Sequence, residues 1–410
     1  MLEAAQAEFY PKVIPRAIIN KASNEPLYAN LGGIDSSYGV LVSKKFGIGT
    51  TLAAGPSSNL AAGVHYTTID YSLNQPLLRG FGTEYNLDAV HRAEFSVASS
   101  IQGFQQARVA TAQEIIRTYY NALMQKQITE INQALAERLR DHVLLTKMKE
   151  KRGLTGPMDT YRATIRLKDA EDTVTQSENT YLNLISRLKW LLDLQPDLEL
   201  KLRSEVPPEM KIVSPVKDAE QYNLELSQFR TSVQESERNA RVADNAILPN
   251  VALQLNYSQP IAGTVIPPTQ QQWSVSVQGS SDLFRSAEKS NAEQARIRSE
   301  ALQMNLAYKA SGIKREIQQQ LMDIATAKSR IVLREAQIKE AEGKLALAKV
   351  KFSNDMANNF EIMESETELQ RAQVSLLESR TDYALSIFDL KAVTGHLLDD
   401  FVSASAQKGN

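Results

Sequence analysis

Residues 65–82 read HYTTIDYSLNQPLLRGFG, a segment that begins as one kind of structure and ends at the start of another. In its first ten residues the side chains alternate between two sets, as in a β-strand with one apolar and one polar face. No proline then occurs from residue 83 to residue 151, and apolar residues recur mostly three or four positions apart. This spacing predicts a helix that, at ~1.5 Å per residue, is roughly 100 Å long.

The composition excludes several classes of protein. The chain has 410 residues, of which 42% are hydrophobic, and a formal charge of −2, so we expect a folded protein with no nucleic-acid partner. It has no cysteine, which excludes disulfides, thiolate metal sites and cysteine nucleophiles. No run approaches the ~18 consecutive apolar residues of a membrane-spanning helix, and MLEAAQAEFYP at the start lacks the apolar region of a signal peptide. Any membrane contact is therefore expected from strands or from an amphipathic surface.

The chain consists of two copies of one pattern, in which two strands are followed by a long helix and a returning helix. Shifted by 202 residues (361 − 159), Asp159 aligns with Glu361, and Tyr181 aligns with Tyr383. The extended run LPNVALQLNYSQ in the second half occupies the place of YPKVIPRAIINK in the first. We therefore predict one structural repeat over residues 1–213 and a second over residues 214–410.

The two repeats are expected to contain corresponding elements. Those of the first repeat are β-hairpin strands at about 10–75, a long helix at about 83–151, a returning helix at about 158–192 and an equatorial segment at about 193–213. Those of the second are a helix at about 217–246, strands at about 248–280, a long helix at about 286–352, a returning helix at about 360–393 and a C-terminal tail. Residues 38–57 also resemble a hairpin, although their alternation is poorer.

The strands of the second repeat alternate regularly between apolar and uncharged polar residues. The positions predicted to share the apolar face are Val251, Leu253, Leu255, Trp273, Val275 and Val277, with Ile69 and Tyr71 in the first repeat. Gln254 and Ser274 are on the opposite face. A half-buried soluble sheet produces this pattern, and so does a transmembrane strand that turns its apolar side to lipid. The uncharged polar face favours lipid, as do Tyr71, Tyr257 and Trp273, which are at positions suited to an interfacial girdle.

The number of strands has a consequence for assembly. Four regular strands cannot close a transmembrane barrel, because about eight are needed, and open strand edges are not tolerated in lipid. If the strands span a membrane, several chains must share one barrel. The apolar seam of the second long helix, from Ile313 to Leu345, likewise requires partner helices.

Three stretches resemble the TolC family of outer-membrane efflux proteins: SLNQPLLRGFG at 72–82, LPNVALQLNYSQP at 248–260 and FEIMESETELQRAQVSLLESRTDYALSIFDLKAVTG at 360–395. Together with the repeat, the resemblance covers roughly residues 8–400. It implies an α+β membrane protein in which three chains form a twelve-stranded β-barrel, continued by a long α-helical coiled-coil barrel. The location implied is the outer membrane of a Gram-negative bacterium, with a large helical part in the periplasm.

The resemblance also implies a function and partners. These are a passive exit duct of a tripartite efflux or type I secretion system, working as a homotrimer with a periplasmic adaptor protein, an inner-membrane transporter and outer-membrane lipid. Members of the family carry a signal peptide and a helix of several dozen residues ahead of the first strand. Only nine residues precede Tyr10 here, so we expect a trimmed form or a fragment.

The resemblance places a pore constriction at the start of each returning helix. The matching carboxylates are Glu361, Glu364 and Asp159, and three symmetry-related copies of each would favour cations over anions. The alternative is that they are ordinary first-turn carboxylates favoured by the helix dipole, and both interpretations can hold together. The family's arginine that ties the closed tip falls on Ala357, so that contact is not expected. Replacement of Glu366 or Glu368, on other faces of the helix, is expected to change cation preference and block by polyvalent cations little.

Docking of the adaptor is implied at the turns between paired helices. The family's turn glycine corresponds to Gly153 in RGLTGP, and Asp355 stands at the equivalent position of the second repeat. Basic residues make the first turn positively charged, which suits either an adaptor contact or a solvated helix end.

Nothing in the sequence indicates catalysis. Gly80-Phe81-Gly82 lacks the third glycine of a dinucleotide fingerprint and is expected to be a turn between strand and helix. The four histidines provide no i, i+4 pair for a metal, and we expect no cofactor, metal or enzymatic activity. The main alternative to a duct is a soluble long-helix coiled-coil scaffold or interaction protein with a small sheet at one end.

Overall fold

The computed structural model describes residues 2–21, 34–61, 64–203, 214–263, 271–354, 356 and 359–399. The chain forms two compact units, one of residues 1–102 and 228–307 and the other of residues 103–227 and 308–410. Each unit therefore draws on both halves of the sequence, and the units do not coincide with the two repeats. The division into repeats at residues 213 and 214 stays a prediction.

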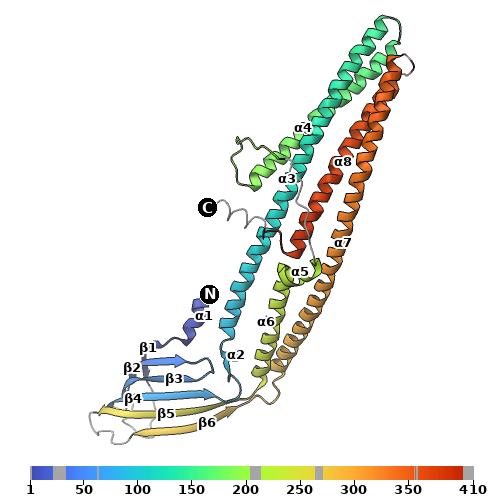
Figure 1. The fold of residues 1–410 in the computed structure, drawn as a ribbon. Coiled ribbons are helices and arrows are strands. Elements are labelled where there is room, and N and C mark those ends of the chain that lie inside the picture. Colours follow the sequence, from blue (N-terminus) through green and yellow to red (C-terminus); the bar gives the residue numbers. More distant parts are fainter. Residues whose placement is uncertain are drawn as a thin grey trace, which may run out of the picture. The chain divides into compact units, whose positions relative to one another are not determined.

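A six-stranded antiparallel sheet belongs to the first unit, with its strands in chain order (Figure 1). The strands are β1 (Lys12–Lys21), β2 (Ile34–Lys45), β3 (Thr51–Ala61), β4 (Val64–Pro76), β5 (Asn250–Gly263) and β6 (Gln272–Ser280). The hairpin that residues 38–57 resemble is confirmed as β2 and β3, which lie between β1 and β4. The count of four regular strands is therefore wrong.

The physical reason for this error is a close approach of β2 to β3. A Cβ atom on Gly55 would overlap the carbonyl oxygen of Val40, and one on Gly39 would overlap that of Pro56. Pro56 has no N–H to donate to the ladder, and the pairing is interrupted between Gly39 and Val42. The glycines and the proline that allow this approach also break the alternation by which a strand is recognised in a sequence.

A tight turn connects β4 to the helices. Gly80 and Gly82 have φ angles of 82° and 101°, in the region that favours glycine. The Asn86 side chain donates to the carbonyl oxygens of Gly80 and Gly82 at 2.7 and 2.9 Å. The turn predicted at Gly80-Phe81-Gly82 is confirmed.

Helices make up most of the described chain. They are α1 (Leu2–Gln6), α2 (Thr83–Asn86), α3 (Asp88–Lys151), α4 (Pro157–Leu191), α5 (Pro215–Tyr222), α6 (Leu224–Ile247), α7 (Ser286–Ser353) and α8 (Asn359–Thr394), with a 3-10 helix at Ala7–Phe9. The helix expected at about 217–246 is divided at Asn223, whose side-chain oxygen accepts from the N–H of Leu226 at 2.9 Å and so caps α6. Among the helices described, none has the length and apolar character needed to cross a membrane.

In the second unit α4 returns along α3 and α8 returns along α7 (Figure 1). The buried core lies where α3, α4 and α8 meet and consists of Ala136, Leu139, Val143, Ala163, Leu167, Ala170 and Met363. On α7, Ile313, Ile317 and Leu345 of the predicted seam are buried, whereas Leu321 is 43% exposed. This packing positions the two helix turns and the first residues of α8.

Candidate functional site: the sheet faces and the helix tips

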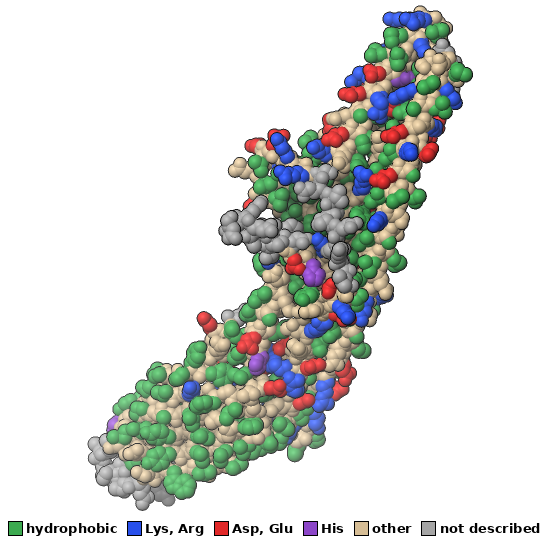
Figure 2. All heavy atoms as spheres, viewed as in Figure 1, with side chains coloured by type: hydrophobic (Ala, Val, Ile, Leu, Met, Phe, Trp, Pro, Cys, Tyr) green, Lys and Arg blue, Asp and Glu red, His purple; other side chains and the backbone are tan. Residues whose placement is uncertain are grey.

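One face of the sheet is apolar and exposed. The strand register pairs Leu255 with Leu73 and Val275, and it pairs Tyr257 with Tyr71 and Trp273. The predicted residues that share this face are Ile69, Tyr71, Val251, Leu253, Leu255, Trp273, Val275 and Val277. Figure 2 shows hydrophobic side chains gathered over the sheet, where charged ones are few. An exposed apolar surface of this kind marks contact with a membrane or with another protein.

The aromatic residues of this face form a single row. Tyr71 and Tyr257 have ring centroids 5.9 Å apart, and Trp273 pairs with Tyr257 across β5 and β6. The row crosses the inner part of β4 and of β5 and meets β6 at its second residue, Trp273, and the interfacial girdle expected from the sequence stays a prediction. The register between strands fixes this height, and the alternation within a single strand gives no information about it.

The opposite face is polar and carries one carboxylate. Asp70 lies between Gly55 of β3 and Ser258 of β5. The hydroxyls of Ser57 and Ser258 each donate to its carboxylate at 2.7 Å, and that of Thr68 donates at 3.2 Å. Strands β3 to β6 contain no other Asp, Glu, Lys or Arg. No pattern in the sequence singles out Asp70, because its hydroxyl partners come from three different strands.

The first helix tip connects α3 to α4. Gly153 has a φ of 71° and closes α3, where its N–H donates to the carbonyl oxygen of Glu150 at 2.9 Å. Asp159, in the first turn of α4, is half-buried and accepts a hydrogen bond of 2.7 Å from the Thr155 hydroxyl. This contact agrees with the helix-end alternative for Asp159, and it leaves the proposed pore role untested.

At the second tip, Asp355 and Ala357 lie outside the described residues. Glu361 and Glu364 are exposed on one side of α8, because its buried positions there are Ile362, Met363, Ser365 and Glu366. Lys344 of α7 is a cation whose charge interacts with both Glu361 and Glu364. Its hydrogen bond to Glu368, at 2.7 Å, is the main cause that raises the pKa of Lys344, and the charges of Glu364 and Glu361 add to the shift.

Asn359 joins the two pairs of helices. It is 4% exposed, its Nδ2 donates to the backbone oxygen of Asp159 at 3.0 Å, and its Oδ1 accepts from Nε2 of His142 in α3. Burial lowers the pKa of His142, and the hydrogen bond to Asn359 and the charge of Glu366 offset this in part. The structure therefore brings Asp159 to the start of α8 through its backbone.

Glu366 is the buried carboxylate of this region. It is 2% exposed and accepts from Nε of Arg138 at 2.5 Å and from Nζ of Lys349 at 3.0 Å, so it ties α8 to α3 and α7. With His142 and Lys149 these residues line a cavity of about 520 Å³. These contacts give Glu366 a part in helix packing, and the expectation that its replacement changes cation preference and block little stays a prediction. Helical spacing places it on another face than Glu361 but does not show which helices cover that face.

The described residues contain no group of three or more His, Asp or Glu side chains placed to hold a metal ion. The geometry instead consists of an exposed apolar face, a polar face with one carboxylate, and helix tips with exposed and buried carboxylates. This arrangement suits a wall between lipid and water.

Comparison with known protein families indicates which class of protein has this arrangement. Residues 216–396 match the family described as outer membrane efflux protein. This part of the second half of the chain therefore carries the sequence pattern of the outer membrane efflux protein family. The resemblance drawn from the three sequence stretches is therefore confirmed. A search of curated protein sequences found no match.

Solved outer-membrane proteins share the fold. VceC of Vibrio cholerae has a TM-score of 0.71 at 14% identity, over 96% of this chain and 89% of that chain. The CmeC channel of Campylobacter jejuni has a TM-score of 0.69 at 15% identity, over 97% and 80%. The MtrE channel of Neisseria gonorrhoeae, in its open state, has a TM-score of 0.67 at 14% identity, over 97% and 83%. At these identities the likeness concerns the fold.

The family match over residues 216–396 and the shared fold together support the chain as an exit duct of an efflux system. It resides in the outer membrane with its helical part in the periplasm, and the kind of system that it serves is a tripartite assembly. It is a transport channel and not an enzyme. The alternative of a soluble coiled-coil scaffold is not favoured.

Proposed function

We propose that three copies of this chain close one β-barrel and conduct cargo passively through it. The observation that carries the proposal is a sheet of six strands with an exposed apolar face and with β1 and β6 at its edges. Open edges are not tolerated in lipid, and six strands are fewer than the roughly eight that a barrel needs. A barrel made by three copies then has eighteen strands (3 × 6), whereas four strands per chain would give the twelve-stranded barrel expected from the sequence.

The two faces of the sheet then have different neighbours. The apolar face, with Leu255 and Val275, meets lipid, and the polar face, with Gln254, Ser274 and Asp70, lines the lumen. Barrels of about 16–18 strands leave an aqueous channel, so this wall is wet on its polar side. The hydroxyls around Asp70 support this assignment, because they satisfy a carboxylate without burying it.

We assign the constriction of the periplasmic end to Glu361 and Glu364, with Asp159 as a third member. Glu361 and Glu364 lie three residues apart, so they share one side of α8, and both are exposed. Threefold repetition places them in two stacked acidic rings, which favour cations and bind polyvalent cations. Lys344 nearby moderates their charge.

The partners of the duct are a periplasmic adaptor at the helix tips and an inner-membrane transporter that supplies the energy. Gly153 and Asp355 mark the two tips, and Asp355 is assigned from the sequence alone. Support comes from exposed apolar residues beside Gly153, which are Leu154 (58%), Met158 (63%), Tyr161 (67%) and Ile165 (61%). A cluster of exposed apolar side chains of this size is typical of a protein interaction site.

Single-channel recordings in planar bilayers test this function. The wild-type protein is expected to give cation-preferring conductance that polyvalent cations block. The double change Glu361→Gln and Glu364→Gln is expected to weaken both the preference and the block. Glu335→Gln is the matched control, because this exposed carboxylate pairs with Arg380 at 2.9 Å, away from the tip. Absence of any conductance contradicts the duct, and unchanged selectivity in the double variant contradicts the assigned constriction.

A further inference from the structure

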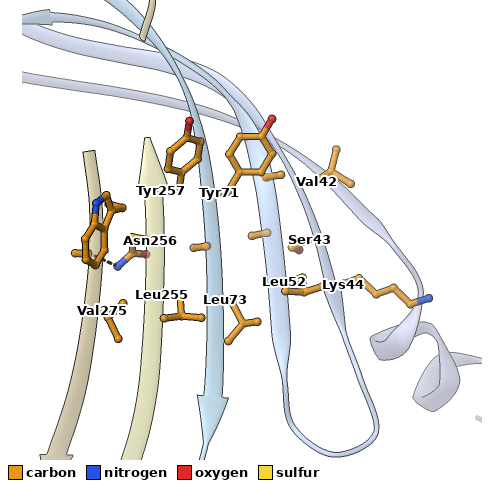
Figure 3. A pocket seen from close by; sticks show the side chains of 15 residues that line it. Val42, Ser43, Lys44, Leu52, Tyr71, Leu73, Leu255, Asn256, Tyr257 and Val275 are labelled. Atoms are coloured by element: carbon orange, nitrogen blue, oxygen red, sulfur yellow. Dashed lines mark hydrogen bonds between the residues drawn. The ribbon is translucent and has the colours of Figure 1, made fainter. Parts of the chain in front are cut away.

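A hollow of about 530 Å³ lies in the apolar face of the sheet (Figure 3). Two adjacent rows of paired residues form it. The upper row in Figure 3 runs across the strands through Val42, Ala54, Tyr71, Tyr257 and Trp273, and the lower row runs through Lys44, Leu52, Leu73, Leu255 and Val275. Ala54 is the smallest side chain of the upper row and stands between Val42 and Tyr71. The hollow is therefore a shallow pocket that is deepest at Ala54 and is lined by the aromatic and aliphatic side chains of the two rows.

Lys44 is the only charged residue among those that line the hollow. It is exposed, and its Nζ lies 5.3 Å from the centre of the Phe46 ring. No carboxylate of the described chain forms an ion pair with it. Its neighbour Lys45 is on the opposite face of β2 and pairs with Glu8 at 2.7 Å. The charge at Lys44 therefore stands on the apolar face without a counter-charge among the described residues.

The chain connections show at which end of the sheet Lys44 lies. Lys44 is at the end of β2 that leads into the turn of residues 46–50, and the carbonyl oxygen of Ile48 accepts from the N–H of Gly82 at 3.2 Å. Gly82 immediately precedes α2, so this end of the sheet is the one from which the helices start. Because the helical part is periplasmic, Lys44 is on the side of the inner leaflet, which consists of phospholipid.

A lysine on a lipid-facing strand is costly near the middle of the bilayer and is tolerated near the headgroups, where its amine can reach a phosphate. We propose that the hollow is a binding site for one phospholipid with an anionic headgroup. The headgroup phosphate pairs with Lys44, and an acyl chain crosses the hollow at Ala54 and Leu73 toward Trp273. This proposal rests on the proposed function, since it requires the apolar face to meet lipid. It adds that this one position selects among lipids by headgroup charge.

The chain offers its own reporter for the test. It has two tryptophans, and Trp190→Phe leaves Trp273, at the edge of the hollow, as the single fluorophore. This variant is reconstituted in vesicles of unlabelled lipid that contain increasing fractions of phosphatidylglycerol or phosphatidylethanolamine with brominated acyl chains. The anionic lipid is expected to quench Trp273 at an approximately fivefold lower mole fraction, the effect of about one lysine near a membrane surface.

Three further changes and one matched control, all in the Trp190→Phe background, separate the contributions of the charge and of the hollow. Lys44→Gln is expected to remove the headgroup preference, and Lys44→Arg is expected to keep it. Ala54→Leu fills the hollow and is expected to weaken quenching by the anionic lipid. Lys45→Gln is the matched control, because it removes the adjacent charge on the opposite face, and the preference should persist.

The outcomes distinguish this inference from the proposed function. Equal quenching by the two lipids in the Trp190→Phe variant overturns the lipid site and leaves the lipid-facing sheet intact. A preference that survives Lys44→Gln also overturns it. No quenching by either lipid overturns the proposed function itself, because Trp273 then does not face acyl chains.

Discussion

Two carboxylates, Asp70 in the sheet and Glu366 at the helix tip, are stabilised in contrasting ways. Asp70 is half-buried and accepts hydrogen bonds from the hydroxyls of Ser57, Thr68 and Ser258. Glu366 is 2% exposed and pairs with two cations from other helices. Hydroxyl donors suffice for a carboxylate that keeps contact with water, whereas a buried one needs cations to offset its desolvation. The difference indicates a wet polar face on the sheet and a dry interior at the tip.

The sheet face opposite Asp70 provides the largest predicted effect. Val275→Arg places a charge on the apolar face and is expected to destabilise the membrane-inserted protein by up to about 2–4 kcal/mol, a cost that applies in full at the middle of the bilayer and falls toward the headgroups. Ser274→Arg, at the adjacent position on the polar face, is expected to cost much less, because the charge reaches the lumen. Denaturant titration of protein folded into lipid bilayers measures both changes. Equal costs at the two positions would contradict the contrast between the faces and would indicate a soluble sheet or a wrong register.

The second largest predicted effect concerns the buried carboxylate of Glu366 at the helix tip. Glu366→Gln leaves Arg138 and Lys349 without their carboxylate and is expected to lower the unfolding free energy of the helical part by about 2 kcal/mol. This is less than the roughly 3–5 kcal/mol typical of breaking a fully buried pair, because Arg138 and Lys349 are 32% and 51% exposed.

Glu368→Gln is the control for this change. Glu368 is 43% exposed in its pair with Lys344, and its replacement is expected to change stability by well under about 1 kcal/mol. Thermal and denaturant unfolding, followed by far-ultraviolet circular dichroism, measure both variants. If the two substitutions have equal effects, the tip interior is not dry and the contrast with Asp70 fails.

His142 provides a smaller, pH-dependent effect at the same tip. Burial lowers its pKa in the folded protein, so the folded state favours the neutral ring. The stability that this ring contributes is present above its unfolded pKa of about 6.5, and it is lost as the pH falls through that value toward the lower folded pKa. The melting temperature of the wild type is therefore expected to fall between about pH 7.5 and pH 5.5 by more than that of His142→Gln. Parallel profiles for the two proteins would contradict a buried neutral histidine.

The sequence predicts local features of this molecule well and long-range ones poorly. The alternation in HYTTIDYSLN predicts β4 and its two faces, and the spacing after residue 83 predicts α3, because both patterns depend on neighbours in the chain. The β2–β3 hairpin is obscured by Gly39, Gly55 and Pro56, which serve the close approach of two strands.

The candidate site shows the same limit. The partners of Asp70 come from β3, β4 and β5, and those of Glu366 come from α3 and α7, so no local pattern reveals either carboxylate as a centre of contacts. Glu361 and Glu364 were singled out by family resemblance, and they stay predictions. Their exposure on one side of α8 is compatible with a constriction and also with a solvated helix end.

The most direct test of the account is a structure of the assembled protein in lipid nanodiscs by single-particle electron microscopy. The account predicts three copies around one closed barrel of eighteen strands, with Val275 and Leu255 toward lipid and Asp70 toward the lumen. A monomeric particle, a closed barrel of twelve strands with β2 and β3 outside it, or a barrel with Asp70 toward lipid would contradict it.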